Sequence, residues 1–335
     1  MQSLPTDFDT DSLSAALTRE WGLAVASLTH APVGFGSHHW VATDPAGGRW
    51  FVTVDDLRKT RNADAEPLDA AFGRLRRALD TARALRDSGA KFVVAPVPTA
   101  GGHPVVRLGD EWAAAVYPYV EGRGFAWDDW SDEAHRRGVL EMVIGVHAAP
   151  PDVRAKAGMD DLSVPHRDAV EAALAGIPPT GDGPYAARTA ALLTEKAQAV
   201  AAWFADYDRM AAAVPRDRDV LTHGETHPGN SMLTADGWRL IDWDTALVAP
   251  PERDLWMLGE ETTAAYATAT GVVARPETIE TYRRWWDVAD FAVSVARFRA
   301  PHTGGEDDDS TWAIIERLGA ELPPVSGGRR PATAG

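Results

Sequence analysis

Short apolar segments alternate with turn residues in the first third of the chain, and this pattern is typical of β-strands. Three such segments follow one another closely, at 27–36, 38–44 and 49–54, separated by a glycine pair and by the turn "DPAGG". Two more appear later, at 92–99 and 103–108. Because connections this short join neighbouring strands in opposite directions, the pattern predicts a small antiparallel sheet.

Apolar residues at helical spacing flank these strands. Residues 11–21 carry leucines at helical intervals behind acidic and hydroxyl capping residues, which predicts a short opening helix. Residues 68–87 carry a longer apolar stripe that ends at "DSGA", which predicts the main helix of the sheet region.

The pattern changes after residue 124, where alanine-rich helical segments replace the strands. We expect helices at about 131–148, 165–175, 186–213 and 276–299. The final "PPVSGGRRPATAG", residues 323–335, has the composition of a disordered tail. The sequence therefore predicts an α+β fold, with a small antiparallel-sheet N-lobe carrying one main helix and a larger, mainly helical C-lobe.

Length and composition narrow the class of protein. A chain of 335 residues exceeds the usual size of one core, so we expect two lobes or domains. The absence of cysteine excludes disulfides, thiolate zinc sites, iron–sulfur clusters and a cysteine nucleophile. The N-terminus does not resemble a signal peptide and no apolar run is long enough to span a membrane, so we expect a cytoplasmic protein without a membrane partner.

The chain is acidic, with a formal net charge of −16. Almost the whole acidic surplus lies after residue 110. A surface of this sign argues against nucleic acid as a partner. Solubility alone could explain it, or it could attract a cationic substrate.

The stretch "THGETHPGN", residues 222–230, contains the most informative chemistry. A zinc site of the HExxH type needs two histidines on one helical face with glutamate next to the first. Here Gly224 intervenes, and Pro228 with Gly229 would break a helix, so we reject zinc. A polar surface turn is the simplest alternative.

The residues that follow argue against a plain turn. After Asn230 a short apolar strand, "WRLI", ends on Asp242 and Asp244. Phosphoryl transfer needs a group that orients the acceptor hydroxyl and hard oxygen ligands for Mg²⁺. A polar loop ending in asparagine, followed by a strand ending in acids, supplies both, so we predict a magnesium–phosphate site.

These two motifs resemble those of a known family. "HGETHPGN" and "IDWD" are similar to the H-G-D-x-x-x-x-N loop and the I-D-[WFY]-[DEG] strand end of the aminoglycoside phosphotransferase family, bilobal ATP-dependent kinases related to protein kinases. The resemblance extends over about residues 27–300, and "RDSGAKFVVAPVPT" with "VYPYVEGRGF" is most similar to the spectinomycin phosphotransferase branch. It implies a protein-kinase-like fold, with a nucleotide-binding lobe at 1–116, a hinge at 117–122 and a catalytic and substrate lobe at 123–322.

The resemblance also implies roles for individual residues. Glu225 takes the place of the family's catalytic aspartate, and His223 that of the histidine that opens the loop. Asn230 and Asp242 match the magnesium ligands. The nucleotide, ATP or another NTP, would meet the hinge backbone and the glycine-containing turn, at Pro118, Tyr119, Val120, Gly34, Gly36 and Ser37.

Two positions depart from the family pattern. Glu225 is one methylene longer than aspartate, so the loop around it must compensate. Thr53 occupies the strand position where the family has a phosphate-binding lysine. Arg58, Lys59 or Arg61, just downstream, could reach the phosphates instead, or could form an ordinary solvated basic loop.

The leading functional hypothesis is an ATP- and Mg²⁺-dependent O-phosphotransferase that acts on a small cationic aminoglycoside or aminocyclitol, for antibiotic resistance or biosynthesis. Alternatives are a kinase of another small alcohol, such as choline, homoserine or a methylthio-sugar, and a nucleotide-binding pseudokinase. The sequence leaves the oligomeric state open. Candidate substrate residues are Asp244, Trp256, Glu260, Glu261 and Tyr266; the simpler interpretation of the last four is a solvated helix face and core aromatics.

Overall fold

A computed structural model describes residues 4–5, 7–34 and 36–322. The backbone divides into two compact units. The first comprises Met1–Ser163 and Val214–Arg283, and the second comprises Val164–Ala213 and Arg284–Gly335. The predicted tail at 323–335 lies outside the described residues, and the lobe boundaries at 117–122 remain a prediction.

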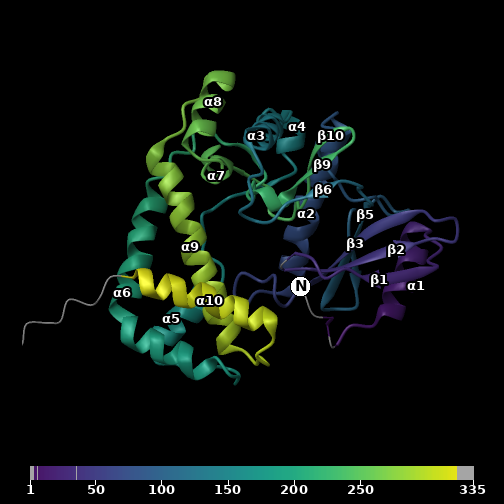
Figure 1. Cartoon of the computed structure of the whole chain (residues 1–335). Helices are drawn as coiled ribbons and strands as arrows, with labels where there is room; N and C mark the ends of the chain where they lie inside the picture. The colour runs from purple at the N-terminus through teal and green to yellow at the C-terminus, as the bar shows by residue number, and fades with distance from the viewer. Residues whose placement is uncertain (1–3, 6, 35, 323–335) are drawn as a thin grey trace, which may run out of the picture. The chain divides into compact units, whose positions relative to one another are not determined.

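The N-terminal part of the first unit is a five-stranded antiparallel sheet in the order β1-β2-β3-β5-β4 (Figure 1). Its strands are β1 (Ser27–His30), β2 (His38–Thr43), β3 (Arg49–Asp56), β4 (Val106–Leu108) and β5 (Trp112–Pro118). Both faces of β5 are apolar, whereas β3 places Trp50, Val52 and Val54 on one face and Phe51, Thr53 and Asp55 on the other. The sheet can therefore pack a helix on either side.

Two helices cover these faces. Helix α1 (Thr10–Trp21) packs Leu13 and Leu17 against Val52 and Val54 of β3. It begins at Asp9, whose carboxylate accepts hydrogen bonds from the first-turn amides, and ends at Gly22 in the left-handed conformation. Helix α2 (Leu68–Asp87) packs its leucine stripe against the opposite face, where Ala113 and Ala115 of β5 leave room. The sequence predicted both helices.

One predicted strand is wrong. Within 92–99 only Val93 forms a β-bridge, to Leu240. Pro96 and Pro98 have no backbone N–H, so this segment cannot sustain a ladder. It crosses between sheets instead, because the Val94 amide bonds to the carbonyl of Leu240 and the Val97 amide bonds to that of Val116.

The rest of the first unit builds two small sheets beside helices. One sheet has the order β10-β9-β6 and the other β7-β11-β8. Helix α3 (Glu133–His147) packs against β8, β10 and α8. The elements are β6 (Arg123–Gly124), α4 (Pro151–Arg154), β7 (Gly158–Met159), β8 (Val220–Thr222), η1 (Pro228–Asn230), β9 (Ser231–Thr234), β10 (Gly237–Leu240), β11 (Leu247–Ala249), α7 (Glu252–Leu255) and α8 (Glu260–Thr270).

The second unit is helical. It contains α5 (Arg167–Leu174), α6 (Ala186–Ala212), α10 (Glu306–Glu321) and most of α9 (Pro276–Arg299), which begins in the first unit. Phe204, Phe291 and Phe298 belong to its apolar core. The acidic run 306–309 forms the first turn of α10, where Asp308 accepts a hydrogen bond from Arg297.

The predicted α+β class is confirmed, with an antiparallel N-terminal sheet and a mainly helical remainder. In the part of the chain that the structure describes, no helix has the length and apolar character needed to span a membrane.

Candidate active site

The loop from His223 to His227 leaves β8 and is fixed by hydrogen bonds at its start. His223 is buried, and its Nε2 lies 2.9 Å from the carbonyl oxygen of Ile241. A carbonyl only accepts, so Nε2 carries the proton, and Nδ1 accepts the Glu225 amide at 3.2 Å. Burial also lowers the pKa of His223, which keeps this ring neutral. His223 therefore positions Glu225 through the backbone.

A second anchor is the carboxylate of Asp254 in α7, which is completely buried. Its two oxygens accept the amides of His223 and Gly224, at 3.0 and 2.6 Å. His147 Nε2 adds a third hydrogen bond at 3.0 Å. Burial acts to raise the pKa of Asp254, but this histidine and neighbouring Arg253 outweigh it and lower the pKa. The start of the loop is thus held by hydrogen bonds from its backbone amides to the buried carboxylate of Asp254.

Arg253 fills the space beneath the loop. Its guanidinium bonds to the Thr222 hydroxyl and to the carbonyl of Thr245, both at 2.9 Å. Gly224 has a φ of 101°, and a Cβ added there would lie 2.4 Å from this guanidinium. Only glycine fits at this position, for both reasons.

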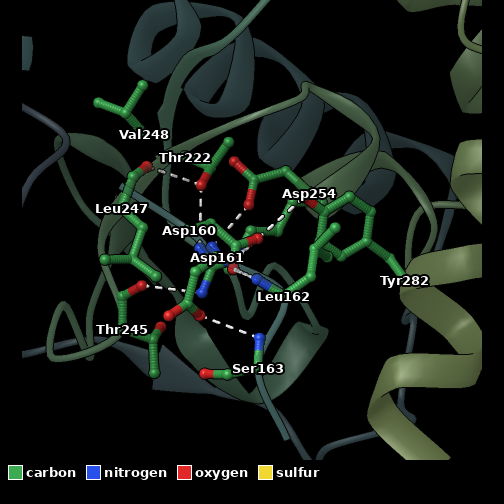
Figure 2. Close-up of polar contacts among 12 residues, drawn as sticks. Asp160, Asp161, Leu162, Ser163, Thr222, Thr245, Leu247, Val248, Asp254 and Tyr282 are labelled. Carbon is green, nitrogen blue, oxygen red and sulfur yellow. Dashed lines mark hydrogen bonds and ion pairs between the residues drawn. The ribbon is translucent and has the colours of Figure 1, made fainter. Parts of the chain in front are cut away.

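Asp160 supports Arg253 from the other side, at 3.8 Å from its Nε. Figure 2 shows the Asp160 carboxylate accepting hydrogen bonds from the Tyr282 hydroxyl and the Leu162 amide, both at 2.9 Å. The same view includes Thr222, whose hydroxyl donates to the carbonyl of Leu247. The sequence did not predict this network of Arg253, Asp160 and Tyr282.

Glu225 is the partly exposed acid of the loop, with 30% of its side chain accessible. Its Oε2 lies 3.7 Å from Nε2 of His227. Burial acts to raise the pKa of Glu225, but His227, His223 and Arg253 outweigh it, so the pKa falls below its ordinary value. The carboxylate is therefore ionised at neutral pH and able to accept a proton.

Asn230 and Asp242 are brought together by backbone pairing. The Asn230 side-chain amide donates to the carbonyl of Glu225 at 3.0 Å, and the Ile241 amide bonds to the Asn230 carbonyl at 2.9 Å. This contact uses the nitrogen of the Asn230 side-chain amide, and its Oδ1 is the atom that could bind a metal. Asp242 follows Ile241 directly and has a φ of 67°, a backbone conformation that residues other than glycine rarely adopt.

Acidic groups of the site act on one another. Asp242 and Asp244 have surface that is accessible to solvent, but many protein atoms surround their carboxyl groups. Burial, followed by the charges of Glu225 and Asp55, raises the pKa of Asp242 to about 7. Burial and Asp242 raise the pKa of Asp244 well above its usual range. The structure thus gathers Glu225, Asp242 and Asp244 into one group of acidic side chains, each close enough to affect the ionisation of the others.

Asp55 also belongs to this acidic group, and the sequence did not predict it. It lies on β3 and is 5% exposed, and the Ser37 hydroxyl donates to it at 2.5 Å. Burial raises the pKa of Asp55 to about 6, although Ser37 opposes the shift. Thr53 lies two residues earlier, on the same face of β3. The predicted turn residues Gly34 and Gly36 both have positive φ values, 67° and 83°.

The basic residues downstream of Thr53 contact carboxylates. Arg58 pairs with Asp56, Asp7 and Glu111 at 2.7–3.0 Å. Lys59 lies 3.8 Å from Asp56. Side chains alternate along a strand, so Asp56 lies on the face of β3 opposite Thr53. The structure therefore does not bring Arg58 and Lys59 to the side of Thr53.

The hinge candidates lie where β5 ends. Pro118 pairs with Trp50 of β3, and the Arg49 guanidinium covers the Tyr119 ring at 4.0 Å. Val120 is half-buried in the link to β6. A side chain at Gly122 would approach the carbonyl of Leu233 to 2.8 Å, so this link requires glycine where it passes β9.

The predicted substrate residues are dispersed. Asp244 belongs to the acidic group described above. Glu260 and Glu261 are exposed in the first turn of α8, and Trp256 is half-buried after α7. Tyr266 is 2% exposed, and its hydroxyl contacts Nδ1 of His147 at 2.8 Å, so in this structure it supports Asp254.

Comparison with known proteins places this geometry in context. Residues 27–292 match the model of the phosphotransferase enzyme family. Protein StrN of Streptomyces griseus is 33% identical over 261 residues, which cover 72% of this chain and 75% of that protein.

Solved structures share the fold. A spectinomycin phosphotransferase, APH(9)-Ia, in complex with ADP and spectinomycin, aligns over 95% of this chain and 96% of its own, with a TM-score of 0.67 and 16% identity. An amicoumacin kinase, hAmiN, in complex with AMP-PNP, Ca²⁺ and its ligand, aligns over 94% and 95%, with a TM-score of 0.56 and 12% identity.

Proposed function

This chain belongs to the phosphotransferase enzyme family, and we propose that it transfers the γ-phosphoryl group of ATP, with Mg²⁺, to a hydroxyl of a small cationic aminoglycoside or aminocyclitol. The observation that carries this proposal is the juxtaposition of an ionised Glu225 with the Asn230 and Asp242 pair. Together these residues supply the groups that phosphoryl transfer requires.

Glu225 is the group that meets the acceptor. In the proposed reaction the acceptor oxygen forms a bond to the γ-phosphorus, the bond to the β–γ bridging oxygen breaks, and ADP leaves. Glu225 accepts the proton released by the hydroxyl, which its lowered pKa and partial exposure allow. His223 and Asp254 hold the backbone so that the longer glutamate side chain stays in place.

The site fits a magnesium ion on the chemistry of its donors. The Asp242 carboxylate makes no hydrogen bond or ion pair with any described residue, and no cation opposes the burial and neighbouring carboxylates that raise its pKa. Among the described residues, no three His, Cys, Asp or Glu side chains could bind a metal by themselves. Mg²⁺ commonly binds one or two protein oxygens and takes its other ligands from phosphate and water. Asn230 and Asp242 would hold it, and the ion would offset charge on the phosphates.

Nucleotide binding is supported by the fold and by the turn. Gly34 and Gly36 provide the positive φ values with which backbone amides can face a phosphate. The hinge around Pro118, Tyr119 and Val120 would meet the base. The structural relatives were solved with ADP or AMP-PNP.

A cationic acceptor is supported by charge. Glu225, Asp242, Asp244 and Asp55 act on one another in the site, and the chain carries a net charge of −16. The structural relatives named above include a spectinomycin complex. Of the substrate residues proposed from the sequence, the acidic ones are Asp244, Glu260 and Glu261, and these are the candidates for contacts to a cationic acceptor.

Thr53 favours one alternative, a nucleotide-binding pseudokinase, because the family's strand lysine is missing. A third candidate is a kinase of another small alcohol, since an aminopropanol kinase shares the fold with a TM-score of 0.58. One experiment separates the three. Purified protein with ATP and Mg²⁺ is offered spectinomycin, hygromycin B, choline, homoserine and myo-inositol, and products are read by the mass of one added phosphate.

We expect phosphate on a cyclic amine and on neither choline nor myo-inositol. The Asp242→Asn variant serves as the control, because asparagine tolerates the left-handed backbone but removes the charged ligand. It should keep its fold and lose turnover by at least ~10²-fold, on the scale of a lost charged catalytic group. ATP binding without turnover of any acceptor would support the pseudokinase instead.

A further inference from the structure

Trp127 is exposed beside the catalytic loop. It is 52% exposed, and it is the only aromatic residue among the large apolar side chains found exposed in the described part of the chain. Tryptophan is usually well buried, because its ring removes a large apolar area from water. An exposed indole next to an active site therefore needs a functional explanation.

The segment that carries Trp127 is held firmly on both sides of it. It runs from the end of β6 to the start of α3. Phe125 packs on the His135 ring with centroids 4.0 Å apart, and Trp130 packs on the same ring at 5.0 Å. His135 is completely buried, and its Nε2 bonds to the Ser231 hydroxyl at 2.6 Å. The exposure of Trp127 is therefore a property of a fixed backbone.

Contacts tie Trp127 to the catalytic carboxylate. Its ring lies 5.4 Å from the His227 ring between centroids, and His227 Nε2 lies 3.7 Å from Glu225. A Cβ added at Gly229 would lie 3.1 Å from His227 and 3.4 Å from the Trp127 backbone. The glycine thus leaves room for the His227 ring, and the Trp127 backbone lies at ordinary contact distance from the same position. An acceptor whose hydroxyl met Glu225 would have the rest of its ring within reach of the indole.

Carboxylates lie next to Trp127 in the chain, whereas Arg123 and Arg136 cover the neighbouring Phe125 and Trp130 rings, each at 4.7 Å. Asp128 and Asp129 follow Trp127 directly, and both are exposed. Neither forms an ion pair with any of the described residues. An aromatic face flanked by carboxylates attracts a protonated amine through cation–π and Coulomb interactions together.

We propose that Trp127, with Asp128 and Asp129, forms the subsite that binds the amine-bearing ring of the acceptor. The inference rests on the proposed function and deepens it, because it names residues that select a cationic, cyclic acceptor. Glu225 meets the reacting hydroxyl, and Trp127 packs on the ring that carries it.

The test compares Trp127→Ala with Trp127→Phe, which keeps an aromatic face. Val273→Ala removes an apolar side chain that is 70% exposed at a position outside this segment, and is the matched control. With the acceptor found in the panel above, Trp127→Ala should raise acceptor KM by roughly five- to thirty-fold, the range of a desolvated cation–π contact. ATP KM and kcat should stay within about two-fold. Trp127→Phe and Val273→Ala should resemble the wild type, and Asp128→Asn with Asp129→Asn should raise acceptor KM less at high salt than at low salt.

Direct binding separates this inference from the proposed function. Calorimetric titration with spectinomycin, hygromycin B and choline, without nucleotide, should show that Trp127→Ala weakens the binding of at least one probe. Equal affinities in wild type and Trp127→Ala, or no binding of any probe, would overturn the inference. A rise in ATP KM instead of acceptor KM would also overturn it, because the indole would then serve the nucleotide. If Trp127→Ala transfers phosphate with an unchanged acceptor KM, the inference about Trp127 is wrong and the proposed function is retained. If the probes bind but no phosphate is transferred, the proposed function is wrong and the inference about Trp127 is retained.

Discussion

Asp55 introduces a buried charge that depends on pH. Its folded pKa of about 6 lies above the ordinary value of 3.8. Well below pH 3.8 the carboxyl is protonated in both folded and unfolded chains, so its burial does not lower the stability of the fold. Between that pH and the folded pKa of about 6 the unfolded chain releases its proton first, so stability falls over this window and the loss is complete once pH has risen through 6. Since a pKa change of one corresponds to about 1.4 kcal/mol, we expect Asp55→Asn to be stabilised by roughly 2–3 kcal/mol at pH 8 and hardly at pH 4.

Denaturant unfolding of the wild type and Asp55→Asn at both pH values measures this difference. Ser37→Ala is the matched control, because it removes the hydroxyl that donates to Asp55 and should increase the cost at pH 8. A gain in Asp55→Asn that is equal at pH 4 and pH 8 would show that packing, and not ionisation, sets the stability of this position.

Glu225 has a role that substitution can isolate. Glu225→Gln keeps the length and most hydrogen bonds of the side chain but cannot accept a proton. We expect kcat to fall by at least ~10²-fold while ATP KM hardly changes. Steady-state kinetics measure both constants, and wild-type kcat in Glu225→Gln would exclude the assigned role.

Sequence motifs indicated candidate site residues, whose roles stay predictions, and gave no sign of residues that act through tertiary contacts. Asn230 and Asp242 were indicated by a polar loop followed by an acidic strand end, and His223 by the resemblance to the family's loop. Asp254 lies 31 residues beyond His223 along the chain, and its local sequence indicates only an acidic residue in a helix. Asp55 likewise reads as one of two acids at a strand end. Its burial depends on Ser37 and the opposing strands, which local pattern does not reveal.

At the scale of elements, helix α7 is joined to the loop at 223–227 by the hydrogen bonds that Asp254 accepts from the His223 and Gly224 amides. Asp254→Asn replaces one acceptor oxygen by an amide that cannot accept from a backbone N–H. We expect the variant to lose roughly 3 kcal/mol of stability, in the range for breaking a buried ionic network, and kcat to fall by ~10-fold or more. Thermal unfolding and kinetics test both expectations.

His147→Gln is the matched comparison, because it removes one hydrogen bond to Asp254 and leaves both bonds to the loop. It should reduce stability more than kcat. If Asp254→Asn retained wild-type kcat, the loop would be held by its own hydrogen bonds, such as that of His223 to Ile241.

Periodicity predicted the elements whose stability is local. The bounds of α2, 68–87, and α9, 276–299, agree with the apolar spacing because one face of each helix is apolar over its length. The segment 92–99 was misread because its valines alternate like a strand, while its prolines remove the donors that a strand needs. Burial of Val93 and Val94 came from packing between sheets.

At the scale of the molecule, the acidic surplus has a kinetic consequence if the acceptor is a cation. Charges in the site should concentrate amines at low salt, and screening should weaken this effect. We expect acceptor KM to rise between about 20 and 300 mM salt while kcat holds. A neutral polyol of similar shape should be a poor acceptor at any salt concentration. A KM that does not depend on salt would favour a neutral alcohol or sugar.

Asp254 holds the loop at 223–227 partly by main-chain amides, which every amino acid except proline offers. Gly224, the His223 ring and the buried Thr226 hydroxyl are also required to hold it, whereas the side chain at 225 makes none of these bonds. A laboratory evolution library that varies residue 225 would keep the same backbone in most of its members, whereas a library at residues 253 and 254 would yield mostly destabilised chains. Under the proposed function, glutamate at position 225 in place of the family's aspartate is the kind of change that such an anchor makes accessible, and new acceptors could be reached by the same route.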